Sequence, residues 1–418
     1  MDYVFSEKSK KITKRVAVSG LAIFLIGVLF DSGIIFEGNT YESLVTEDGH
    51  NYGFSQRIWV ALLTNGIFFF FISLAVLFFI ALQYAAEVSW SIVFKRVYEA
   101  MLSGLPLTVG IIIFIVALGQ FDGHHIYHWQ HYDVSLTEDM AGYDHLLHHK
   151  AFFFHPLFYY PVLFFFMGSF IWFARYYRKQ SLLEDQEGGT RIHFKNFAKS
   201  ALFLVIFGYG SSVISWQLIM SVDAHWFSTL FGWYVFSGMW LEGMVYALML
   251  IIYLKGKGLL KEAKGGHIHD MGKWVFALSF LWTYMFFSQF MLIWYADVPE
   301  EVTYFQARIN DYTVIYWIIF FVNFAIPMLF LMDADAKKNR GLLVMVGCIV
   351  FFFHWLDIFI MISPGAMKSE AGLGFIEIGS FLLFLGVFTF IVLRSLASRP
   401  LLVKNHPYLE EGKAIHHH

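Results

Sequence analysis

Long apolar runs separated by short polar segments dominate the chain. A helix that crosses the hydrocarbon core of a bilayer needs about 20 apolar residues. Ten runs reach roughly that length, and most charged residues lie between them. The pattern predicts an all-α polytopic membrane protein with ten transmembrane helices, which cover 16–36, 55–82, 98–120, 153–175, 199–220, 226–254, 272–296, 311–332, 341–362 and 373–395.

Lys and Arg gather in every second connecting segment. Of the 29 such residues, 25 lie in the N-terminal tail, after the second, fourth, sixth and eighth predicted helices, and after the tenth. Because cytoplasmic loops are enriched in Lys and Arg, both termini are predicted to be cytoplasmic. The opposite face is acidic and His-rich, and it carries a long loop, 121–152. The four remaining basic residues fall on this outer face: Arg57, Lys150, Arg308 and Lys368.

The order of the helices suggests an internal repeat. Helices 2–5 and helices 6–9 run in the same order and direction, and parallel repeats are a known membrane architecture. We therefore predict two four-helix bundles flanked by helices 1 and 10. The predicted parts are the N-terminal tail with the first helix (1–54), the first bundle (55–220), the second bundle (221–362), and the last helix with its cytoplasmic tail (363–418).

Composition agrees with a membrane protein and excludes several classes. Hydrophobic residues make up 58% and charged residues 15% of the chain, whereas soluble domains have about 25% charged residues. The single cysteine, Cys348, excludes a disulfide framework, a cysteine-ligated iron–sulfur cluster and a covalent c-type haem on this chain. No phosphate-binding loop motif occurs, and no basic patch with interleaved aromatics favours nucleic-acid binding. Haem b is disfavoured because only His354 lies well inside a predicted helix.

The predicted helix 226–254 carries a carboxylate, Glu242, deep in its apolar part. Tyr234, Gly238, Glu242 and Tyr246 recur every four residues, so a helix places them on one stripe. A carboxylate in lipid is costly and usually has a partner or a function.

Further polar residues are predicted to extend from this carboxylate toward the outer face. The string FFFHWLDIF places His354 and Asp357 on one helix face. Membrane proton relays are built from Asp, Glu and His chains, although polar contacts that only hold helices together are the alternative. The predicted relay consists of Glu242, Tyr284, Gln289, His354, Asp357 and Glu377.

An outer mouth for a quinone or for protons is predicted at Asp223, His225 and His155. Quinol hydroxyls need acceptors that can take protons, and His and Asp serve. Alternatively, Asp223 is a helix cap.

The outer loop is rich in histidine. His124, His128 and His131 would align on a helix face, which suits a metal. However, no acidic ligand stands at a diagnostic spacing, so we predict no metal site and favour a surface for a partner. The histidines between the third and fourth helices are His124, His125, His128, His131, His145, His148, His149 and His155.

Several strings together resemble a known family. DAHWFSTLFGWYVFSG, FFSQFMLIWYADVPEE, HHIYHW and DHLLHHKAFF are similar to the polysulfide-reductase membrane subunit family of the NrfD/PsrC type. Within it the chain most resembles the shorter, ActF-type membrane subunits of alternative complex III, a quinol:cytochrome c oxidoreductase. The resemblance covers nearly the whole chain.

The resemblance implies a role in a respiratory complex of the bacterial inner membrane. It implies a homologous longer membrane subunit, an iron–sulfur subunit and c-type cytochrome subunits as partners, with a terminal oxidase as an optional further one. Haem c and iron–sulfur clusters would then sit on partner subunits. Quinol oxidation near the outer face is implied, with proton translocation and quinone binding by this chain left open.

Three functions stay open from the sequence. The chain supports quinol oxidation and proton movement without being an enzyme alone; it is a scaffold of the same complex; or it is a secondary transporter. The transporter is disfavoured because no paired Gly/Pro-broken helices mark a midplane substrate site.

Overall fold

The computed structural model describes residues 3–32, 53–133, 135–140 and 142–414. Every regular element within these ranges is a helix. Ten helical segments of these described ranges are long and apolar enough to cross a membrane, which confirms the predicted all-α polytopic fold. The segment between the first two predicted spans, 37–54, was assigned to the outer face, and it lies outside the described residues except for its last two.

Each predicted span corresponds to one helical segment. In chain order these are α1 (Glu7–Asp31), α2 (Gly53–Ala85), a composite of η1 (Trp90–Phe94), α3 (Lys95–Met101), η2 (Leu102–Gly104) and α4 (Leu105–Gly119), then α7 (Pro156–Glu187), α8 (Arg191–Leu218), α9 (Leu230–Gly256), α10 (Gly265–Ala296), α12 (Thr313–Leu331), α13 (Arg340–Met367) and α14 (Phe375–Leu396). The shorter helices are η3 (His128–His131), α5 (His145–His149), α6 (Ala151–Phe154), η4 (Met220–Asp223), α11 (Pro299–Asp311), η5 (Ala336–Lys338), η6 (Lys368–Glu370) and α15 (Leu409–Ala414).

The observed helices extend beyond several predicted ends. α1 begins at Glu7, α7 continues to Glu187, and α10 begins at Gly265. A hydropathy pattern detects only the part of a helix that fits the hydrocarbon core, so polar turns at its ends are missed. The third span is also interrupted, because Pro106 has no backbone N–H and starts a new helix, α4, in its first turn.

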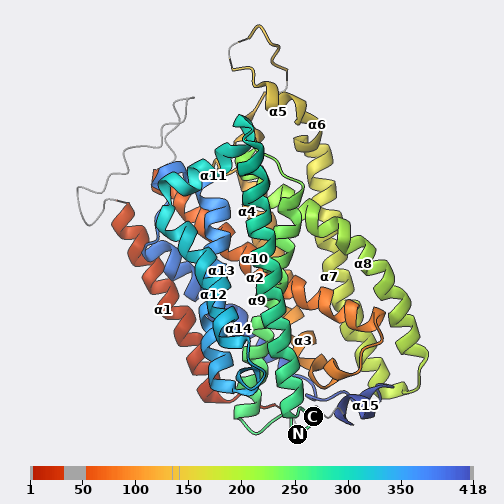
Figure 1. The fold of residues 1–418 in the computed structure, drawn as a ribbon. Helices are drawn as coiled ribbons and strands as arrows, with labels where there is room; N and C mark the ends of the chain where they lie inside the picture. Colours follow the sequence, from red (N-terminus) through yellow and green to blue (C-terminus); the bar gives the residue numbers. More distant parts are fainter. Residues whose placement is uncertain (1–2, 33–52, 134, 141, 415–418) are drawn as a thin grey trace.

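The helices α2 and α9 form the centre of the molecule (Figure 1). In their apolar windows 89% and 83% of the residues are buried, against 17% in α1. α1 packs along α14 on one side, while α7 and α8 pack together on the opposite side. α2 contacts helices of both halves, including α4, α8, α9, α13 and α14. The division into two bundles stays a prediction.

The two ends of the helix assembly differ. Both chain termini lie at one end, which we call the termini end (Figure 1). The opposite end carries α5, α6 and α11, and we call it the loop end. Helix α11 lies between the seventh and eighth predicted spans, where no helix was predicted. Its Pro299 and its two first-turn glutamates are helix-start signals that an apolar-run search does not use.

Glycines let α1 and α14 approach closely. A Cβ added to Gly20 would lie 2.3 Å from the backbone N of Leu383, and one added to Gly379 would lie 2.3 Å from the backbone N of Phe24. Gly27 and Gly386 make similar contacts, each seven residues from the first pair. Small residues that permit close backbone approach are a common basis of helix association in membranes.

Replacing Gly379 with Leu is therefore expected to separate α1 from α14. Backbone atoms block the new side chain, so the helices must move apart and lose contact along their length. We expect a thermal unfolding midpoint in detergent several degrees below that of the wild type. Gly208→Leu is the matched control, because no atom lies within 4 Å of its added Cβ. Equal midpoints for the two variants would contradict this packing.

Candidate functional site

A buried polar cluster lies where α9, α10 and α13 meet. The carboxylate of Asp357 on α13 accepts a hydrogen bond from the Tyr234 hydroxyl of α9 at one oxygen. Its other oxygen accepts from Trp282 Nε1 of α10, with a distance of 3.0 Å. One turn nearer the termini end, the His354 ring packs edge-on against Trp282, with ring centroids 5.0 Å apart. The structure thus brings the predicted pair His354 and Asp357 together around one tryptophan.

Glu242 lies on the same stripe of α9 as Tyr234, two turns nearer the termini end. Between them lies Gly238, whose added Cβ would be 3.3 Å from Trp282 and 3.6 Å from His354 Nδ1. Glu242 is 1% exposed. Among the described residues, no hydrogen-bond partner reaches Glu242 Oε1 or His354 Nε2. Two titratable side chains are therefore buried with an unpaired polar atom each. Such burial costs free energy, which makes both residues candidates for a function.

A small cavity lies between Asp357 and the loop end. Tyr234, Gln289, Tyr316 and Arg308 line it together with Asp357. Its volume is about 20 Å³ of space for the centre of a water molecule, which is room for about one water. Gln289 Nε2 and Tyr316 Oη have no protein partner within the described part of the chain. The cavity can therefore hold a hydrogen-bonded water, but not a quinone ring.

Arg308 of α11 closes this cavity toward the loop end. The guanidinium donates to Asp223 Oδ2 at 2.8 Å. It also donates to the backbone carbonyls of Ile360, Met361 and Tyr304 at 3.0 Å or less. Burial alone would lower the pKa of Arg308, but the attraction of Asp223 and the nearby tyrosines outweighs it and raises that pKa. Arg308 therefore stays charged and fixes the Asp223 carboxylate.

Asp223 lies between this buried cavity and the surface. Its side chain is 22% exposed, whereas that of Arg308 is 1% exposed. It ends η4, and α9 begins seven residues later at Leu230, so Asp223 does not cap α9. An added Cβ on Gly365 of α13 would lie 2.7 Å from Asp223 Oδ1, so only glycine leaves room for this carboxylate.

The other two residues of the predicted mouth contact groups other than Asp223. The Nε2 atom of His225 contacts Asp144 Oδ2, and its ring stacks on His128 with centroids 5.2 Å apart. Asp144 also caps α5. Burial raises the pKa of Asp144, but the His225 contact and two backbone N–H groups outweigh it and lower that pKa. His155 is exposed and caps α7 by accepting from Leu157 N.

Two residues of the predicted relay are not part of the cluster. The Tyr284 side chain is 61% exposed on the outer surface of α10. Glu377 instead receives two hydrogen bonds from Arg57 of α2, 2.6 and 2.7 Å long, and Arg57 also binds Asp31 of α1 at 2.9 Å. Helix register alone did not show which face of α10 and α14 meets α9. Glu377 therefore belongs to an ion-pair network that joins three helices.

Sequence reasoning missed Arg308 and Arg57 as site and network residues. The available signal was their position, because both are basic residues on the otherwise acidic outer face. A lone cation near the membrane surface needs a carboxylate partner, and both have one. Tyr234 was placed on the Glu242 stripe but was not included in the relay.

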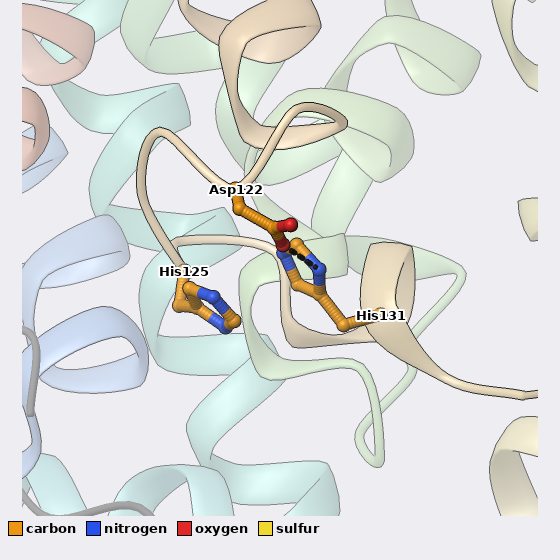
Figure 2. A group of neighbouring side chains, drawn as sticks. All are labelled: Asp122, His125 and His131. Carbon is orange, nitrogen blue, oxygen red and sulfur yellow. Dashed lines mark ion pairs between the residues drawn. The ribbon is translucent and has the colours of Figure 1, made fainter. Parts of the chain in front are cut away.

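The His-rich loop does not place His124, His128 and His131 on one helix face. His124 is buried and its Nε2 contacts Ile115 O at 2.8 Å. Instead, His125 and His131 stack with ring centroids 3.9 Å apart, and His131 Nδ1 lies 3.0 Å from Asp122 (Figure 2). These three side chains are close enough to hold a metal ion, and Asp122 and His131 also lie at ion-pair distance from each other on the surface.

No protein-family model and no curated protein matches this chain.

Proposed function

We propose that this chain is a proton-conducting membrane subunit of a quinol-oxidising respiratory complex. The proposal rests on the buried titratable series together with the resemblance of its motifs to the NrfD/PsrC-type subunits, and most closely to the shorter, ActF-type subunit of alternative complex III. In this proposal the loop end faces the periplasm and both termini are cytoplasmic, in the bacterial inner membrane. The charge distribution along the chain supports that orientation.

The observation that carries the proposal is the order of the buried groups. From the middle of α9 toward the loop end they are Glu242, His354, Asp357, the cavity and Asp223. Each group except the cavity can take and release a proton. A water in the cavity would connect Asp357 to the loop end beside Gln289 and Tyr316. Arg308 keeps its charge, so it orients Asp223 without carrying the proton.

Quinol oxidation is proposed for the interface with partner subunits. The cavity on this chain has room for about one water, so the headgroup is proposed to bind beside the homologous longer membrane subunit. The haem c groups and iron–sulfur clusters are proposed to lie on the partner chains, with the terminal oxidase as an optional further partner. The chain alone is then not an enzyme.

Purification of the complex tests this function. A tagged copy of this chain, isolated from native membranes in mild detergent, should bring with it c-type haem absorbance and an iron–sulfur signal in electron paramagnetic resonance. Decylubiquinol or menaquinol should reduce the haem in that preparation. A chain that purifies without any haem or iron–sulfur protein would contradict the proposal and favour a stand-alone transporter.

The scaffold remains the second candidate, and specific observations favour it for part of the molecule. The Arg57, Asp31 and Glu377 network and the close contact of α1 with α14 hold helices together without a route for protons. Substitutions in the Glu242–Asp223 series separate the two functions. A scaffold loses assembled complex, whereas a proton conductor assembles normally and loses proton movement.

A further inference from the structure

A second buried cluster lies at the termini end of the molecule. Glu184 comes from the end of α7, His193 from the start of α8, and His406 from the segment between α14 and α15. One ligand atom from each side chain lies within 4.8 Å of the other two, and all three residues are buried. Their exposed fractions are 1%, 2% and 7%. Folding thus collects two imidazoles and a carboxylate from distant parts of the chain.

The proposed proton series does not use these groups, and their hydrogen-bonding capacity is largely unfilled. Within the described residues, neither ring nitrogen of His193 has a hydrogen-bond partner, nor does Glu184 Oε1. The nearest carboxylate oxygen to His193 Nε2 belongs to Glu87 and is 3.8 Å away, which is too long for a hydrogen bond. Unpaired buried imidazole and carboxylate atoms are each costly. A bound cation that accepts all three as ligands would remove that cost.

We propose that Glu184, His193 and His406 bind a divalent transition-metal ion of the zinc or ferrous iron class. Two imidazoles and one carboxylate form a donor set that such ions favour. Ligands about 2.0–2.1 Å from a tetrahedral ion lie roughly 3.4 Å apart. The three ligand atoms already lie within 4.8 Å of one another, so small side-chain movements are needed to reach that spacing.

The surroundings support one bound cation. Lys95 Nζ donates to Glu184 Oε2 at 2.8 Å, so it orients the carboxylate and leaves Oε1 for the metal. Such outer contacts orient metal ligands. Next to this pair, Arg96 binds both Glu99 and Asp185. With Glu87 beside His193, four carboxylates therefore lie near two cations, and a divalent ion offsets the remaining negative charge.

The fourth coordination position opens toward a cavity. His193, His406 and Lys95 line this cavity, which offers about 30 Å³ of space for the centre of a water molecule. A water there completes the coordination.

His406 Nδ1 now accepts a long contact, 3.3 Å, from Tyr408 N. When the metal binds Nε2, the ring proton moves to Nδ1, which then no longer accepts from Tyr408 N. The metal would link the C-terminal segment to the α7–α8 hairpin.

Co²⁺ binding by the purified chain in detergent tests the site. The reference chain and all variants lack residues 415–418, because His416, His417 and His418 could bind metals themselves. After dialysis against EDTA, the chain is titrated with Co²⁺ and followed by visible absorption. We expect one equivalent to bind with tetrahedral or five-coordinate bands. Glu184→Gln and His193→Ala should weaken Co²⁺ binding at least about tenfold.

His131→Ala is the matched control, because it disables the exposed Asp122, His125 and His131 group at the other end. It should leave the binding unchanged. As a second readout, EDTA should lower the thermal midpoint of the unsubstituted chain and have no effect on His193→Ala. Loss of binding in His131→Ala alone would assign the metal to the loop end and overturn the proposal. Absence of Co²⁺ binding by the folded chain would overturn it as well.

Discussion

Replacing Asp357 with Asn is expected to slow proton release through the complex by about 100-fold, the scale of a lost proton-transfer group. The Asn side-chain oxygen can still accept from Tyr234 or Trp282, so the packing of α9, α10 and α13 is preserved. The amide cannot take up and release a proton, so transfer between His354 and the cavity stops. Proton release beyond that from quinol itself is measured with a pH dye outside reconstituted vesicles.

The control for Asp357→Asn is Tyr159→Phe. Tyr159 is buried in α7 and donates to Gln217 O at 2.7 Å, but it lies outside the proposed series. It should retain wild-type proton release and the same subunit content. If Asp357→Asn instead reduced the amount of assembled complex, with normal proton release per complex that remained, the cluster would be structural and the scaffold function would stand.

Replacing Arg308 with Met is expected to destabilise the loop end by about 3 kcal/mol, at the low end for a broken buried ion pair. The low end applies because the side chain of Asp223 is 22% exposed and retains some water. The substitution leaves Asp223 without its cation and removes three hydrogen bonds to backbone carbonyls of α11 and α13. Detachment of α11 should follow, measured as faster amide hydrogen exchange within Pro299–Asp311.

Arg308→Lys is the matched variant for this prediction. Lysine keeps the charge but lacks the planar fork of donors that reaches the carboxylate and the carbonyls together. It should show amide exchange in α11 that is intermediate between the wild type and Arg308→Met. Unchanged exchange in Arg308→Met would mean that α11 is held by Trp226, Tyr304 and neighbouring aromatic contacts instead.

Hydropathy and charge alone were enough to predict the ten spans, because a helix that crosses the lipid core requires a long apolar run. They did not show that α1 would reach Glu7 or that Pro106 would interrupt the third span. Nor did they show α11, whose composition is that of a surface helix. Its first-turn glutamates were visible in the sequence, but its packing against α13 was not.

For the site, helix spacing correctly indicated that residues on one helix share a face, as with His354 and Asp357. It did not fix the rotation of one helix against another, so Tyr284 was included although it faces outward. Glu377 was assigned to the relay because its depth was right, while its partner, Arg57, comes from a helix 320 residues away in sequence. Such pairings depend on tertiary packing that no local pattern encodes.

Proton release per electron in the Glu242→Gln complex tests the proposed series most directly. Glu242 is its deepest member, and Gln fills nearly the same volume without carrying a proton. Vesicles with wild-type and variant complexes are given quinol and oxidised cytochrome c under equal conditions. The proposal predicts normal assembly, continued electron transfer and fewer protons released per electron in the variant. The same number of protons per electron in both complexes would contradict it.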